Sequence, residues 1–189
     1  MSIIKINTPL TEDVAKSLKV GDEILLSGTI YTARDAAHKR LIELLDNGKE
    51  LPINIKDEII YYVGPTPNRE DEVIGSAGPT TGYRMDAYTP RLLDLGLRGM
   101  VGKGVRNDLV VESIKKNNAI YFAAIGGAGA LISKCIVKCD IICYEDLGSE
   151  AIRKLEVKDL PLTVAIDCNG DNLYIIGKQE YLNQSKGNI

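Results

Sequence analysis

Two threonines, an arginine and an aspartate stand close together at residues 78–86, in the segment GPTTGYRMD. Glycine and proline favour a tight backbone there. Thr80 and Arg84 are four residues apart, so they point to one side if the loop enters a helix. A hydroxyl beside a planar guanidinium, which stays charged, suits a carboxylate ligand. The segment therefore predicts a site for a carboxylate-bearing substrate.

A second chemical segment, TARDAAHKR, covers residues 32–40. On a helix Arg34 and His38 share one face, because they are four residues apart. His38 is the only histidine of the chain, and histidine is the usual group for proton transfer near neutral pH. His38 is therefore a candidate catalytic residue, although a surface helix that begins with ordinary charges would explain the segment too.

Two glycine-rich loops add a third cation and a candidate anion site. Lys103 stands between Gly102 and Gly104 at the end of a predicted strand, where glycines let a ligand approach, although a plain turn explains them equally well. The spacing is not that of a phosphate-binding P-loop. Gly126 and Gly127 precede a predicted helix, whose N-terminal amides would attract anions. Close helix–sheet packing accounts for these small residues as well.

Cys135, Cys139 and Cys143 are spaced by four residues, and Cys168 stands apart. Thiolates in such runs can hold iron–sulfur clusters. This run, however, crosses a predicted junction from helix to strand, so even spacing in sequence does not bring the thiols together. We favour buried cysteines that act as small apolar side chains. Disulfides are not expected in a reducing cytosol.

Composition excludes several classes of protein. The chain has 189 residues, of which 44% are hydrophobic and 26% charged, with a net charge of −3. This mixed charge predicts neither nucleic acid nor an anionic membrane as partner. Tryptophan is absent and phenylalanine occurs once, which removes an aromatic platform for bases. No signal peptide and no apolar run near ~20 residues is evident, so we expect a cytoplasmic protein.

The elements that would position these residues alternate along the chain. We expect a single α/β domain over residues 1–178, followed by a polar, weakly ordered tail at 179–189. Predicted helices begin with capping residues such as Thr11. Strands are predicted at 3–10, 23–31, 51–56, 59–64, 73–77, 99–102, 119–125, 141–144, 162–167 and 172–176, and helices at 11–18, 35–47, 89–97, 109–118, from the loop at 126–129 to about 137, and at 150–155.

Arg34, Arg84 and Lys103 each follow or end a predicted strand, so they can meet at one edge of a sheet. Three cations suit a small dicarboxylate. Removing a proton next to a carboxylate and expelling a hydroxyl both need strong charge stabilisation, and a metal usually polarises the hydroxyl. The sequence contains no convincing metal site. The constellation therefore predicts half of an active site.

Five segments, in order, carry a family resemblance. They are SGTIYTARDAAH at 27–38, GPTT with RMD at 78–86, MVGKG at 100–104, GGA at 126–128 and YEDLG at 144–148. Together they resemble the β subunit of class I (iron–sulfur) fumarate hydratase, and the related β subunit of L(+)-tartrate dehydratase. The likeness runs from about residue 8 to 174. It implies a swivelling β/β/α domain, with a mixed sheet and flanking helices.

The resemblance also implies a function. It implies a hydro-lyase that reversibly hydrates fumarate to (S)-malate, with a partner α subunit that carries a [4Fe–4S] cluster. Arg34, Arg84 and Lys103 match substrate-contacting positions. Thr80 matches a threonine proposed as the base, and His38 matches a position taken as a proton acceptor. These two assignments compete, and a threonine hydroxyl is a weak base until it is paired or desolvated.

Three points stay open at the level of sequence. Tartrate differs from malate by one hydroxyl, and no residue identifies the group that would recognise it. A non-catalytic docking or regulatory module remains an alternative to an enzyme subunit. Tyr83 departs from the family pattern, which usually has Ser-Gly or Ala-Gly at residues 82–83, and its role in the pocket or at a subunit interface is unassigned.

Overall fold

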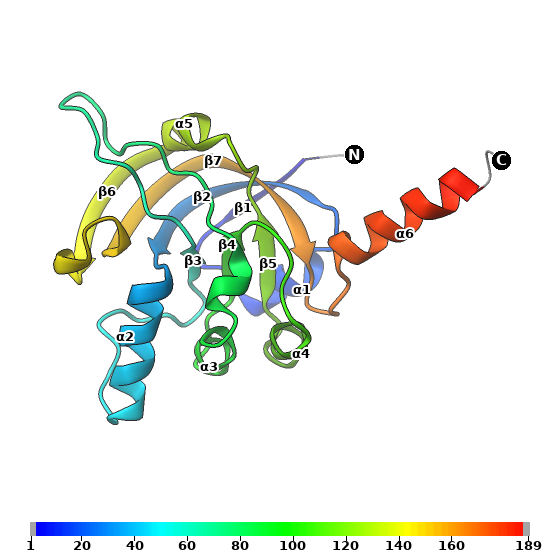
Figure 1. Ribbon diagram of the computed structural model, residues 1–189, viewed down its shortest axis with the longest axis horizontal. Coiled ribbons are helices and arrows are strands. Elements are labelled where there is room, and N and C mark those ends of the chain that lie inside the picture. Colours follow the sequence, from blue (N-terminus) through cyan, green and yellow to red (C-terminus); the bar gives the residue numbers. More distant parts are fainter. Residues whose placement is uncertain (1–2, 187–189) are drawn as a thin grey trace.

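Five parallel strands lie side by side in chain order in the computed structural model, which describes residues 3–186 (Figure 1). Because neighbouring strands are parallel, their carboxyl ends meet at one edge of the sheet, where ligands of open α/β sheets bind. The strands are β1 (Ile4–Asn7), β2 (Glu23–Thr32), β3 (Ile59–Tyr61), β4 (Gly99–Gly102) and β5 (Ile120–Ala123).

Two antiparallel strands complete the sheet, β6 (Ile136–Cys143) and β7 (Ile152–Ile166). The long β7 pairs with β5 near its end, with β2 along its middle and with β6 near its start. The strands β2, β3, β4, β5 and β7 therefore form a closed ring, and β1 and β6 remain as edges. In Figure 1, β6 and β7 arch over the parallel strands.

Four helices follow the parallel strands: α1 (Glu12–Ser17), α2 (Asp35–Asp46), α3 (Thr89–Asp94) and α4 (Asp108–Asn117). In Figure 1, α2, α3 and α4 lie together on the side of the sheet away from β6 and β7. Shorter turns are η1 (Gly82–Met85), α5 (Gly129–Ile132), η2 (Ser133–Cys135) and η3 (Glu145–Glu150). The last helix, α6 (Leu173–Lys186), extends away from the body of the molecule (Figure 1). No helix within residues 3–186 has the length and apolar character to cross a membrane.

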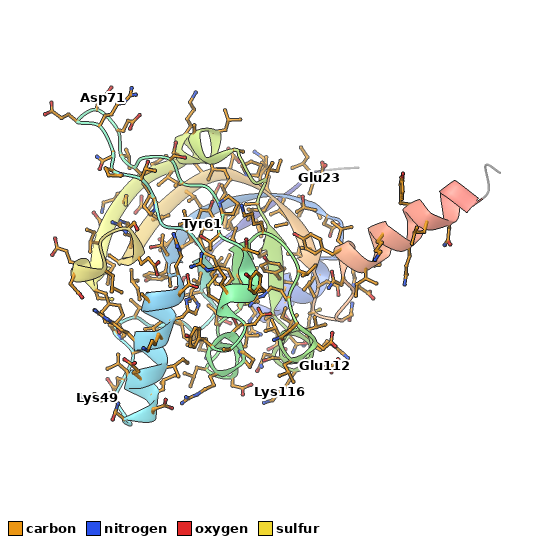
Figure 2. All side chains as sticks on the ribbon, in the orientation of Figure 1. Glu23, Lys49, Tyr61, Asp71, Glu112 and Lys116 are labelled. Atoms are coloured by element: carbon orange, nitrogen blue, oxygen red, sulfur yellow. The ribbon has the colours of Figure 1, made fainter. Side chains whose placement is uncertain are left out.

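Two separate cores confirm the expected β/β/α layers. Side chains alternate across β3, since successive residues of a strand face opposite sides. Ile59, Tyr61 and Val63 pack in the core beneath β6 and β7, whereas Ile60 and Tyr62 pack against the helices. Tyr61 lies near the centre of the molecule (Figure 2), and its hydroxyl donates to the Ala77 carbonyl. The expected fold class, a mixed sheet with flanking helices, is confirmed.

Local signals fixed several element ends. The Thr11 hydroxyl accepts a hydrogen bond from the Val14 amide at the start of α1, as the capping residue predicted. The α2 helix ends just before Gly48, whose φ of +65° suits glycine. Pro90 lies in the first turn of α3, where its missing amide hydrogen costs nothing.

Two predicted strands are wrong, at 51–56 and 73–77. Ile53 and Ile55 are buried, so the alternation is real, but within residues 3–186 no strand pairs with this segment. Residues 73–77 fold back on their own loop instead, where the Ser76 amide donates to the Thr66 hydroxyl. A strand needs a partner, and the alternation of apolar residues does not supply one.

Two predictions near the C-terminus are also corrected. The helix predicted at 150–155 is replaced by the start of β7, because pairing along β2 outweighs local propensity. The strand predicted at 172–176 is helical from Leu173, where the Asn172 side chain accepts from the Tyr174 amide. The segment from Gln179 to Lys186 lies in α6, and the weak order expected of this polar tail stays a prediction. Residues 187–189 of that tail, like residues 1–2, lie outside the described part.

Candidate active site

The carboxyl ends of β2 to β5 carry the residues singled out in the sequence. Arg34 follows β2 and is the N-cap of α2. Thr80 and Arg84 lie in the long connection after β3, Lys103 follows β4 directly, and the loop at 126–127 follows β5. The predicted meeting of these segments at one sheet edge is therefore found.

Residues 80–82 insert between the ends of β3 and β4. The Thr80 amide donates to the Tyr62 carbonyl at 2.7 Å, and the Lys103 amide donates to the Thr80 carbonyl at 3.1 Å. The Gly82 amide then donates to the Lys103 carbonyl at 2.8 Å. These backbone bonds fix Thr80 and Lys103 as neighbours. The Lys103 side chain extends toward Gly126, where its Nζ lies 3.8 Å from the position of an added Cβ.

Two carboxylates hold the two arginines at this edge. Arg84 Nε donates to Asp35 Oδ1 at 2.8 Å, and Arg34 Nε lies 3.8 Å from the other oxygen of Asp35. Glu150 joins Arg34 Nη2 at 3.2 Å, while its second oxygen accepts the Ala36 amide at 2.9 Å. The turn η3, part of the resemblance, thus positions the start of α2.

The two guanidiniums differ in exposure, since the Arg34 side chain is 21% and the Arg84 side chain 42% exposed. Arg34 Nε is buried, with no hydrogen-bond partner among the residues that the structure describes, and Nη1 lies against Gly64, where an added Cβ would approach it to 2.6 Å. Arg84 is exposed and uses only Nε among the described residues. A planar fork with free N–H groups can bind a carboxylate through two parallel hydrogen bonds.

His38 is not at the surface of this edge. Its side chain is fully buried beside the rings of Tyr62 and Tyr88. Nδ1 lies 2.8 Å from the Arg34 carbonyl, and since a carbonyl only accepts, Nδ1 carries the hydrogen. Nε2 is buried, and no described residue forms a hydrogen bond with it. Burial lowers the pKa of His38 to about 4, against the opposing effect of the Arg34 carbonyl, so the ring is neutral near pH 7 and anchors the backbone of Arg34.

Arg106, which sequence reasoning missed, supports the site from beneath. Its side chain is 0% exposed, and its Nε donates to Asp86 Oδ1 at 2.6 Å. Nη2 donates to the Thr89 hydroxyl at 2.8 Å, and the guanidinium lies over the rings of Tyr62 and Tyr121. Asp86 also accepts the Asn107 amide. The aspartate of the 78–86 segment is therefore a structural anchor, and no spacing in the sequence marked Arg106 as its partner.

The segment from the glycine loop to the cysteines contains a shorter helix and an earlier strand than the sequence predicted. The helix predicted from 126–129 to about 137 is wrong, because α5 has only four residues and the chain enters β6 at Ile136. Anion binding by Gly126 and Gly127 stays a prediction. Cys139 and Cys143 lie in β6, and burial raises the pKa of both thiols. Within residues 3–186, no three His, Cys, Asp or Glu side chains are grouped as metal ligands.

The site residues lie at an open edge, where Arg84 is exposed and Arg34, Thr80 and Lys103 are half-buried. A groove of about 670 Å³ lies elsewhere, between the 66–76 loop and the α5–β6 segment, and its lining includes Arg69 and Lys134. Asp71 lies at the tip of that loop, far from α2, α3 and α4 (Figure 2). Tyr83 is 61% exposed on η1, beside Arg84. Its exposure leaves it free to meet a molecule that covers the edge.

Removing the partner of Arg106 tests the support beneath the site. We expect Asp86→Ala to lower the free energy of unfolding by about 3–5 kcal/mol, because it leaves a buried guanidinium unpaired. Asp46→Ala is the matched control, since the Arg91–Asp46 pair is exposed and worth about 0–1 kcal/mol. Urea unfolding measures both. Equal, small losses would contradict a supporting role for this pair.

The burial of His38 predicts an unusual titration. Its folded pKa is lower than the ordinary 6.5, so the unfolded chain binds the extra proton first as pH falls. The contribution of His38 to stability is complete above about pH 6.5 and is lost between about 6.5 and 4, by on the order of 3 kcal/mol. NMR titration of His38, the only histidine of the chain, should give a midpoint near pH 4, provided that the protein stays folded at that pH. A midpoint near 6.5 would show an accessible imidazole.

Comparison with known proteins places the chain among named relatives. Residues 1–177 match the family model described as Fumarase C-terminus. The chain is 38% identical over 175 residues to "Fumarate hydratase class I, aerobic" of Escherichia coli K12, covering 90% of this chain and 32% of that protein. "Fumarate hydratase 2" of Leishmania major is 38% identical over 157 residues, 82% of this chain and 28% of that protein.

A shorter relative has nearly the same extent. The "Putative L(+)-tartrate dehydratase subunit beta" of Methanocaldococcus jannaschii is 37% identical over 171 residues, covering 87% of this chain and 88% of that protein. This chain thus spans about a third of the length of the fumarate hydratases it matches. From these matches, the chain belongs to the Fumarase C-terminus family, together with relatives named class I fumarate hydratase and tartrate dehydratase β subunit.

Proposed function

We propose that this chain is the β subunit of a two-subunit hydro-lyase that reversibly hydrates fumarate to (S)-malate in the cytoplasm. The observation that carries the proposal is the meeting of three cations and a threonine hydroxyl at the carboxyl edge of consecutive parallel strands. The same segments carry the likeness to fumarate hydratase. Membership of the Fumarase C-terminus family supports this class of reaction.

The cations bind the two carboxylates of the substrate in this proposal. Arg84 and Arg34 offer guanidinium N–H groups beyond those held by Asp35 and Glu150, and Lys103, whose backbone is bonded to that of Thr80, offers an ammonium near Gly126. Loss of a proton next to a carboxylate moves negative charge onto its oxygens, and cations fixed beforehand stabilise that charge without reorganisation. The pairing with Asp35 keeps Arg84 in place before substrate arrives.

Thr80 is the better candidate for the base that removes this proton. It is half-buried at the open edge, and its backbone is bonded to that of Lys103. A neighbouring cation favours the charged alkoxide over the neutral hydroxyl. His38 is fully buried, and its pKa of about 4 makes it a weak base. We assign His38 a positioning role, through its hydrogen bond to the Arg34 carbonyl.

The cofactor, a [4Fe–4S] cluster, belongs to the partner α subunit in this proposal. The residues described here do not fit a cluster, since they contain no group of three suitable ligand side chains. When bound, the cluster supplies a Lewis-acidic iron for the substrate hydroxyl. The longer fumarate hydratase relatives have about two thirds of their length outside the part that this chain matches, which is room for a cluster-binding part. Tyr83 and the open edge are candidates for the subunit contact.

A tartrate dehydratase β subunit is the second candidate function. The Methanocaldococcus jannaschii relative with that name is matched over 88% of its length, so the subunit sizes correspond. A site that hydrogen-bonds the second hydroxyl of tartrate can discriminate strongly against malate. The ratio of kcat/KM for the two substrates decides between them. A non-catalytic docking module is the third alternative, and it predicts that the site residues can be replaced without loss of turnover.

The first functional test removes one guanidinium. Reconstituted anaerobically with a cluster-loaded α subunit, the wild-type chain should turn over malate or tartrate, and the isolated chain should not. Arg84→Ala should lower kcat/KM at least about a hundredfold by removing charge stabilisation, of the size seen when a preorganised donor is lost. Arg69→Ala, on the exposed 66–76 loop, is the control and should leave turnover unchanged. Full activity of Arg84→Ala would favour the docking module, and an inactive wild-type complex would refute the hydro-lyase.

The second test separates Thr80 from His38. Thr80→Val keeps the shape of the side chain and removes its hydroxyl, so kcat should fall by about 10²–10⁴, the usual contribution of a base. His38→Asn keeps a donor for the Arg34 carbonyl and should retain most of the activity, with an unchanged pH profile. If His38→Asn instead abolished turnover while Thr80→Val did not, the histidine would be the base. Circular dichroism of each variant checks that the fold is retained.

A further inference from the structure

The strand β6 (Ile136–Cys143) is an open edge of the sheet. Among the described residues it pairs with β7 alone, and it is the last strand in the sheet order. An edge strand has a row of backbone N–H and C=O groups without partners, which makes it a template for another strand. In Figure 1, β6 forms the outer rim on the side opposite α6. The spaced cysteines noted in the sequence lie in and beside this strand.

The sequence of β6 reads almost the same in both directions around Cys139. The segment at 135–143 is CIVKCDIIC. Counted outward from Cys139, Lys138 is matched by Asp140 and Val137 by Ile141. In an antiparallel pair of identical strands, residues at equal distances on either side of the two-fold axis stand opposite each other. Each lysine would therefore face an aspartate, and each apolar residue would face another.

The side chains concerned are accessible. Val137 is 52% and Ile141 is 47% exposed, which is unusual for β-branched residues in a strand. Lys138 and Asp140 are 58% and 47% exposed, and they pair within the chain at 2.9 Å. Both charges and both apolar side chains are therefore available to a strand laid along this edge, with opposite charge in register.

We propose that β6 pairs antiparallel with β6 of a second copy of this chain, around a two-fold axis at Cys139. The interface is isologous, because the same surface of one copy contacts the same surface of the other. Such a contact forms a dimer and leaves no free copy of that surface for a third chain. Two Lys138–Asp140 pairs cross the axis and set the register, and two Val137–Ile141 contacts exclude water beside them. This dimer surface is distinct from the carboxyl edge of β2 to β5, so it does not depend on the proposed function.

Charge reversal with mixing tests the pairing. In sedimentation velocity at tens of micromolar, the full wild-type chain should have twice the 20.6 kDa mass of one copy. Lys138→Glu places acid opposite acid, and Asp140→Lys places base opposite base, so each variant alone should sediment as a monomer. An equal mixture should recover the dimer, because the acid introduced at position 138 of one copy meets the base introduced at position 140 of the other. The pairing within each chain stays broken in the mixture, so only contact between chains explains recovery.

Thiol cross-linking tests the register. A chain with Cys135→Ser and Cys143→Ser retains Cys139, which faces itself across the axis, and a short bis-maleimide should link the two copies. The control retains Cys143 through Cys135→Ser and Cys139→Ser. Its two copies of residue 143 would lie roughly 26 Å apart, at ~3.3 Å per residue of strand, and should not be linked.

Three results would overturn the proposal. A monomeric wild-type chain would show that the irregular pairings flanking residues 138–141 and the two charges protect the edge, as is usual for edge strands. A wild-type dimer that persists in both single variants would place the contact elsewhere. Cross-linking of the Cys143 control with equal efficiency would exclude the register centred on Cys139.

Discussion

The buried guanidinium of Arg106 is the interaction on which the candidate site depends. It joins Asp86 and Thr89 from the connection after β3 to the segment that follows β4, above the rings of Tyr62 and Tyr121. A charge with no exposure is tolerated only when it is paired and its hydrogens are satisfied. The buried Arg106–Asp86 ion pair therefore holds residues 80–86 in place from below the surface. The glycines fit the same constraint, since an added Cβ on Gly82 would lie 2.6 Å from the Tyr121 hydroxyl.

Above this support, the surface is built to hold positive charge in place. Arg34 and Arg84 would repel each other at the sheet edge, and Asp35 lies between them with one oxygen toward each. Glu150 adds a second carboxylate from η3. These acids offset the repulsion and leave N–H groups available. A dicarboxylate that binds there in the proposed reaction would meet cations whose orientation is already set.

The sequence predicted much of this arrangement because the signals were local. Thr11, Gly48 and Pro90 mark helix ends through capping chemistry, and the parallel strands follow from short apolar runs between helices. Features that depend on distant pairing were missed. The sequence at the start of β7 predicts a helix, but pairing with β2 makes it a strand. Residues 51–56 alternate between apolar and polar, yet no strand among the described residues pairs with them.

The candidate site shows the same division between local and distant signals. Arg34, Thr80, Arg84 and Lys103 were marked by their own loops and by the family resemblance. His38 was marked by its type, but its burial is tertiary. Arg106 had no signal, because its partner Asp86 is twenty residues away. The most direct test is a crystal structure of the chain with its α subunit and a bound dicarboxylate. We expect nitrogens of Arg34, Arg84 and Lys103 within about 3 Å of carboxylate oxygens. A ligand bound away from the carboxyl edge of β2 to β5, with these three side chains untouched, would contradict the account.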